Sequence, residues 1–144
     1  MKYLIAIFAL LLALSFAGCE KAAKALSTTI SGTVTDNDST ISGALIMVLA
    51  YGDTLTAGIT LSNGSITNSA GRYTVIEVDP GDYYVCAIRD LNGNLSLDPG
   101  IDEIGYYGDT LLGITVPAKV TLHNEEEDLE NINILEMYTL PGEK

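Results

Sequence analysis

The strongest constraint on the fold is a succession of short runs rich in Val, Ile, Thr and Tyr that begins at Ile30. Clusters of Asn, Asp, Gly, Ser and Pro separate these runs, and such clusters favour turns. β-branched and aromatic residues favour strands, and no segment after Ile30 has the period of a convincing amphipathic helix. The sequence therefore predicts an all-β fold, a single antiparallel β-sandwich of about seven strands.

The expected strands differ in how much of their surface is apolar. The run at 43–51 is apolar on both faces, so we expect it to be covered on both sides. In the run at 30–35, Ile30, Gly32 and Val34 share one face. The full set of expected strands is 30–35, 43–51, 54–62, 72–78, 82–89, 113–122 and 129–137.

The N-terminus has the pattern of an export signal. Lys2 precedes an unbroken apolar run at 4–14, which is too short to cross a bilayer. Small residues then lead into Cys19, and this arrangement resembles the lipobox of bacterial lipoproteins, except that Phe16 stands where leucine is usual. The resemblance implies cleavage before Cys19 and acylation of its thiol. The alternative is an ordinary secretory signal followed by a chance cysteine.

These features predict four segments: a lipoprotein signal peptide at 1–18, a lipidated tether at 19–29, a β-sandwich domain at 30–138 and a C-terminal tail at 139–144. Removing the first 18 of 144 residues leaves 126, enough for one domain with a core. The protein is then expected to be exported and attached to the envelope membrane through acyl chains on Cys19. Glu20 is not the aspartate that retains many Gram-negative lipoproteins at the inner membrane, which favours the outer membrane in a Gram-negative host.

Charge restricts the partners. Without Lys2, six basic residues face 19 acidic ones, a formal charge of −13. Such a surface repels phosphate backbones, so we expect no nucleic-acid partner, whereas divalent cations, envelope proteins or glycans remain candidates. No catalytic motif is found, and His123 is the only histidine that could serve a nucleophile. We therefore expect no catalytic residues and interpret Cys86, within a strand, as a buried structural cysteine.

Several motifs occur in an order that is similar to the carboxypeptidase regulatory-like domain. ISGTVT at 30–35 is followed by ISGALIMV at 41–48, GRYTV at 71–75 and PGDYYV at 80–85. Members of that family have a transthyretin-like (prealbumin-like) sandwich, an Ig-like Greek key. The resemblance implies that Tyr73 packs inward after a sharp turn at Gly71, and it implies an accessory role without catalysis.

The segment at 90–103 is the one place where oxygen ligands gather at a meaningful spacing. Its pattern resembles an EF-hand calcium loop, but Leu95 replaces the glycine at position six and Ile101 the acid at position twelve. The alternative is an Asn-Gly hairpin whose side chains bond their own backbone. The candidate Ca²⁺ ligands are Asp90, Asn92, Asn94, Ser96 (by its carbonyl), Asp98 and Asp102.

Other features leave alternatives open. The acidic run at 124–131 is a solvated loop or a site for cations or partners. The sequence at 51–60 is partly repeated at 107–115, and this repeat is either a pair of similar turns or a paired site of Asp53 and Asp109. Tyrosines at 83, 84, 106 and 107 pack in the sandwich or form a glycan platform.

Two hypotheses for the function follow from these features. The protein is a non-catalytic envelope lipoprotein that binds or scaffolds, or it is a calcium-stabilised carbohydrate- or peptide-binding module. A hydrolase of unrecognised type is a third, weaker alternative.

Overall fold

The computed structural model describes residues 28–50, 64–111 and 114–142. The predictions for the signal segment, Cys19, the tether up to residue 27, the strand at 54–62 and Asp53 lie outside the described residues. Within them every regular element is a strand, and the expectation of an all-β fold is confirmed. There are thirteen strands in this part of the chain, and four of them have only two residues.

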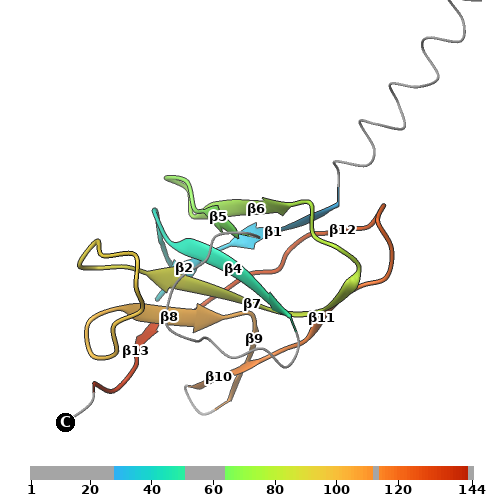
Figure 1. The fold of residues 1–144 in the computed structure, drawn as a ribbon. Coiled ribbons are helices and arrows are strands. Elements are labelled where there is room, and N and C mark those ends of the chain that lie inside the picture. Colours follow the sequence, from blue (N-terminus) through green and yellow to red (C-terminus); the bar gives the residue numbers. More distant parts are fainter. Residues whose placement is uncertain (1–27, 51–63, 112–113, 143–144) are drawn as a thin grey trace, which may run out of the picture.

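Two sheets carry most of the strands (Figure 1). The smaller sheet has the order β12-β1-β6, where β1 pairs antiparallel with β6 and parallel with β12. The larger sheet has the order β13-β8-β7-β4-β5, and β11 pairs with the first residues of the long strand β7. Their bounds are β1 Thr29–Thr33, β4 Leu45–Ala50, β5 Gly64–Ile66, β6 Arg72–Ile76, β7 Gly81–Arg89, β8 Glu103–Tyr106, β11 Val120–Leu122, β12 Asp128–Leu129 and β13 Tyr138–Thr139.

Two further pairs are short hairpins: β2 (Thr35–Asp36) with β3 (Ser39–Thr40), and β9 (Gly108–Leu111) with β10 (Ile114–Pro117). The expected single strand at 113–122 is thus wrong, because it divides into β10 and β11, which pair with different strands. Pro117 has no N–H for a continuing ladder, which accounts for the break. The expected strand at 129–137 is also mostly irregular, since β12 ends at Leu129 and Asn131 adopts φ 62°.

The main core lies between the two sheets and gives a sandwich-like arrangement. Ile30, Val34 and Tyr73 from the smaller-sheet side share one cluster with Ile46 and Val85 of the larger sheet. A second cluster covers the opposite face of the larger sheet, and its buried members are Leu45, Met47, Cys86, Ile88 and Ile104. Alternate residues of β4 therefore enter different clusters, which confirms that this strand is covered on both sides. Tyr73 packs inward and Gly71 has φ 69°, also as expected.

The C-terminal segment closes the molecule against β1. The backbone N–H groups of Ile132 and Ile134 donate to the carbonyls of Ser31 and Thr33. The Tyr73 hydroxyl donates to the carbonyl of Ile132, so β6 holds the same segment. A Cβ on Gly32 would lie 2.1 Å from the Ile132 carbonyl oxygen, which shows how closely this segment approaches β1. Residues about 100 positions apart thus fix the start of the domain.

Candidate functional site: the loop between β7 and β8

The segment at 90–102 connects two paired strands at one end of the larger sheet. Arg89 at the end of β7 lies opposite Glu103 at the start of β8, and their side chains form an ion pair of 3.1 Å. The loop extends from this pair at the end of the molecule opposite the start of β1 (Figure 1). It is therefore a loop of thirteen residues that joins two adjacent strand ends, longer than a two-residue hairpin turn.

Asp90 organises the first half of the loop. One carboxylate oxygen accepts the N–H of Gly93 at 2.6 Å, and the other accepts the N–H of Leu95 at 2.8 Å. The bond from Leu95 is the main reason that the pKa of Asp90 lies below its usual value, with smaller contributions from other backbone N–H groups of the loop. Asp90 is thus held in its charged form while the chain bends around it.

Asp98 gathers the amides of the loop. Its Oδ2 accepts hydrogen bonds from Nδ2 of Asn92 and Nδ2 of Asn94, both at 2.6 Å. The two amide oxygens bond the backbone two residues further on, at Asn94 and Ser96. Three of the candidate ligand side chains therefore meet at one point, and the amide oxygens form the Asx turns that the hairpin alternative expects.

Asp102 lies at the base of the loop and is fully buried. Its two carboxylate oxygens accept the N–H of Leu91 at 2.9 Å and the N–H of Asp98 at 2.7 Å. Both ends of the loop are thus fastened to one side chain. Asp102 therefore bonds backbone N–H groups of the loop, and the described hydrogen bonds do not join it to the amide side chains that meet at Asp98 Oδ2.

Leu95 has φ 57°, in the left-handed region. It occupies the sixth position of the loop counted from Asp90, where an EF-hand loop requires glycine for its sharp bend. The bend therefore forms here without the glycine, at a conformational cost for leucine of order 1–3 kcal/mol. Gly93 has φ 74° and carries the earlier bend.

The fit to calcium is partial. Calcium needs six to eight oxygens, and Asp90, Asn92, Asn94 and Asp98 supply carboxylate and amide groups of the right kind on one short loop. In the described part of the chain, no three His, Cys, Asp or Glu side chains lie close enough to form a metal group. An ion here would thus depend on amide and backbone carbonyl oxygens, including that of Ser96, and the amides would have to turn their oxygens inward.

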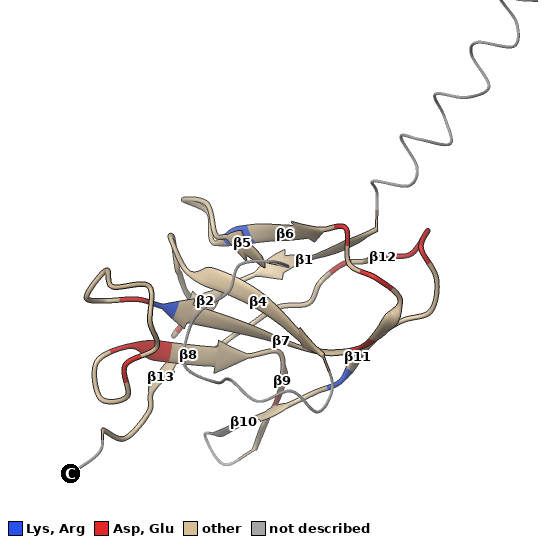
Figure 2. Ribbon diagram, viewed as in Figure 1, with Lys and Arg blue, Asp and Glu red and all other residues tan. Residues whose placement is uncertain are grey.

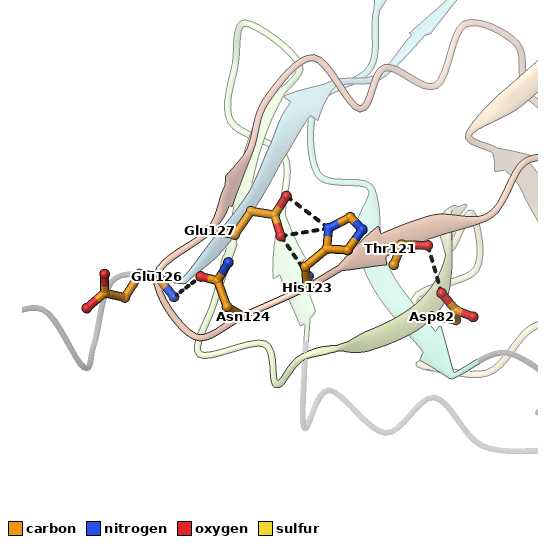
Figure 3. Close-up of polar contacts among 6 residues, drawn as sticks. All are labelled: Asp82, Thr121, His123, Asn124, Glu126 and Glu127. Carbon is orange, nitrogen blue, oxygen red and sulfur yellow. Dashed lines mark hydrogen bonds and ion pairs between the residues drawn. The ribbon is translucent and has the colours of Figure 1, made fainter.

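A second polar group surrounds the end of β11 (Figure 3). The His123 ring lies 3.2 Å from Glu127, whose carboxylate also accepts the backbone N–H of His123 at 2.6 Å. This backbone bond is the main reason that the pKa of Glu127 is lowered. Asn124 accepts the N–H of Glu126, so the acidic run begins with an ordered, exposed turn whose side chains bond its own backbone.

Asp82 lies on β7 beside this turn and contacts β11. It accepts hydrogen bonds from Lys119 at 2.8 Å and Thr121 at 2.7 Å, and these lower its pKa, with Lys119 the larger cause. Acidic residues gather at this end of the molecule, between β6 and β7 and beside β12, and a second group lies near the start of β8 (Figure 2). The ion pair between Asp82 and Lys119 is exposed, and exposed ion pairs contribute little to stability.

Cys86 and the tyrosines occupy packed positions. Cys86 is fully buried, and burial raises the pKa of its thiol to about 12. Tyr106 packs into the same cluster against Tyr138, with ring centroids 6.4 Å apart. Tyr83 and Tyr107 instead pack against the core between the sheets. Of the tyrosines at 83, 84, 106 and 107, three are thus divided between two cores, which favours packing over a shared platform for these three.

The sequence interpretation missed three exposed apolar side chains on the loop. Leu91, Leu95 and Ile101 are 50%, 64% and 50% exposed, whereas Leu97 packs into the second core cluster. The signal was present in the sequence, since apolar residues alternate with the oxygen-bearing ones over much of this loop. The polar side chains bond one another and the loop backbone, whereas Leu91, Leu95 and Ile101 face solvent.

No family model, curated protein or solved structure matches the chain. In the described ranges, no helix has the length and apolar character needed to cross a bilayer.

Proposed function

We propose that this chain is a non-catalytic lipoprotein of the cell envelope. Acyl chains on Cys19 hold it to the membrane, and a carboxypeptidase regulatory-like, transthyretin-like domain carries out a binding or scaffolding role. The observation that carries the proposal is the placement of the two ends: β1, which follows the tether, begins at the end opposite the ordered β7–β8 loop (Figure 1). A protein anchored at one end and exposing a rigid loop at the other is suited to binding at a distance from its membrane.

The environments of Cys86, a potential nucleophile, and His123, a potential base, support a binding role. The Cys86 thiol is enclosed in the second core cluster, and its raised pKa of about 12 keeps it protonated. His123 lies on the acidic turn and is engaged by Glu127. Neither group is arranged to activate the other, because Cys86 is in the middle of β7 and fully buried, whereas His123 follows β11 and is exposed.

The experiment is membrane fractionation of the native host expressing the full chain or a Cys19→Ala variant. We expect the unaltered protein in the membrane fraction and resistant to extraction by high salt, because acyl chains bind by hydrophobic burial. The variant should be recovered in the soluble exported fraction or as unprocessed precursor. Cys86→Ala is the matched control and should remain with the membrane. Membrane retention of the Cys19→Ala protein after cleavage of its signal would contradict the proposal.

The second candidate is a calcium-stabilised carbohydrate- or peptide-binding module. It is favoured by one observation: Leu95 adopts the left-handed bend of a calcium loop while Asp90 and Asp98 gather the surrounding donors. Calcium would then fix the loop, with an affinity in the range of extracellular modules. Such a role is structural and needs no change in the rest of the domain.

Calorimetric titration of the full chain in detergent with Ca²⁺ tests this candidate. Binding should release or absorb heat and raise the melting temperature, and Asp98→Ala should abolish both effects. Asp109→Ala removes an exposed carboxylate on β9, outside the loop, and is the matched control. Absence of heat together with an unchanged melting temperature would exclude the calcium site, as would equal responses of the two variants. Glycan titration with and without Ca²⁺ then distinguishes a carbohydrate ligand from a peptide.

A further inference from the structure

We propose that the β7–β8 loop is the docking element for a protein partner. Leu91, Leu95 and Ile101 insert into an apolar pocket of that partner, and Lys and Arg side chains border the pocket. This inference rests on the binding role proposed above and names the surface and the chemistry of its partner. It does not depend on acylation of Cys19.

The polar side chains of the loop bond one another and the loop backbone, while Asn92 and Asn94 are themselves exposed. The carboxylates at Asp90 and Asp102 point to backbone N–H groups of the loop, and the amides of Asn92 and Asn94 point to Asp98. Leu91, Leu95 and Ile101 are at least half exposed. Apolar residues scattered singly over a surface need no explanation, but three on one loop of thirteen residues are a concentration.

Leu95 is the most informative of the three. Among the described residues, the others at positive φ are glycines or have polar or charged side chains, and Leu95 alone is aliphatic. Glycine or asparagine would adopt φ 57° at lower cost. Its side chain is 64% exposed, so intramolecular packing does little to offset the strain. A strained and exposed apolar side chain is expected where the side chain serves binding.

The loop is fixed before it meets a partner. Asp102 fastens both ends of the loop, and the N–H of Gly100 donates to the carbonyl of Leu140 at 2.7 Å, which ties the loop to the C-terminal segment. A Cβ on Gly100 would lie 3.1 Å from Gly142, so the two segments are in close contact. A prearranged loop loses little conformational entropy on binding, which favours its use as a docking element.

Charge selects the kind of partner. The segment at 89–103 holds four acids and one cation, Arg89, which is already paired with Glu103. Anionic lipid and a second copy of this acidic chain are both repelled by it. The segment contains no aromatic residue on which a sugar ring could stack. A protein pocket with an apolar floor and a basic border complements both the leucines and the carboxylates.

The test is photocrosslinking in the native host, with a benzophenone amino acid at position 95 of the full chain and, as control, at position 76. Ile76 is 56% exposed and lies on β6 at the other end of the molecule. Irradiation should give an adduct with one protein from position 95 and not from position 76. An adduct with lipid or glycan, or no adduct specific to position 95, would overturn the proposal.

The crosslinked protein is then purified and its affinity for the full chain measured. Leu95→Gly should weaken binding by about tenfold or more and yet raise the melting temperature, because it removes both the contact and the backbone strain. Ile76→Thr should leave the affinity unchanged. Binding should also weaken as salt is raised. Unchanged affinity of the Leu95→Gly protein, or affinity independent of salt, would overturn the proposal. A bare thiol at Cys19 would overturn the lipid anchor alone.

Discussion

Asn133 accepts two hydrogen bonds from Thr33 through a single oxygen, one from the backbone N–H and one from the hydroxyl, each 3.0 Å long. The same arrangement recurs four residues earlier on β1, where Asp128 accepts both bonds from Thr29 at 3.0 and 2.8 Å. The C-terminal segment therefore holds β1 at two places. Since β1 is the first strand of the described residues and would follow the proposed tether, these contacts secure the point at which the proposed anchor would join the domain.

Replacing Asn133 with alanine should lower the free energy of unfolding by about 1–2 kcal/mol, because it leaves the part-buried N–H and hydroxyl of Thr33 without their acceptor. Urea denaturation measures the loss. Asp128→Ala removes the equivalent but exposed pair and should cost less, since water replaces its hydrogen bonds. Equal losses for the two variants would contradict this account of the terminal contacts.

A second prediction concerns the close approach of the C-terminal segment to β1. Gly32→Ala should destabilise the protein by about 1–3 kcal/mol or more, because its Cβ would lie 2.1 Å from the Ile132 carbonyl oxygen and the backbone must move. Gly142→Ala is the control, because its Cβ would find ordinary contact distances of 3.4 Å or more. Thermal unfolding of both variants provides the comparison, and a fully stable Gly32→Ala protein would show that the segment does not pack as described.

Cys86 should resist alkylation in the folded protein. With a thiol pKa of about 12 and no exposed surface, it is protonated and inaccessible at about pH 8. The Cys19→Ser variant has Cys86 as its single cysteine, so iodoacetamide labelling followed by mass spectrometry reports on this thiol alone. Labelling should occur only after denaturation in urea. Rapid labelling under native conditions would place Cys86 at the surface and reopen a catalytic interpretation.

The lowered pKa of Asp90 predicts a pH dependence. A carboxyl group with a depressed folded-state pKa contributes stability above its unfolded pKa of about 3.9, and this contribution is lost as the pH falls through the folded value. The stability difference between the native protein and Asp90→Asn should therefore be present at neutral pH and disappear in acid. Denaturation curves across this range measure it. A difference that grows as the pH falls would have the opposite sign and would exclude the hydrogen bonds from Gly93 and Leu95.

The sequence predicted those parts of the fold that depend on local pattern. The apolar residues of β4 alternate between two clusters, as their unbroken hydrophobic run required, and Gly71 and Tyr73 occupy the turn and core positions expected of them. The all-β class follows from the same regularities. These features are encoded within ten or so neighbouring residues, and local periodicity is sufficient to find them.

Contacts between distant segments were not predictable in this way. The last part of the chain continues beyond β12 as an irregular segment because Asn131 turns it at φ 62° and because Ser31 and Thr33 offer carbonyls to it. Nothing in the apolar pattern of 129–137 distinguishes that outcome from a regular strand. The candidate loop was located by its oxygen-bearing residues, but whether Asp102 faces an ion or the backbone of Leu91 depends on the folded geometry.

The most direct test of the proposed function is the intact mass of the protein purified from membranes of its native host. We predict a chain that begins at Cys19 and carries the added mass of a diacylglyceryl group, with a further fatty acyl chain where the host adds one. A chain cleaved elsewhere, or one whose Cys19 thiol is unmodified, would contradict the claim that this acidic β-domain is a membrane-anchored lipoprotein.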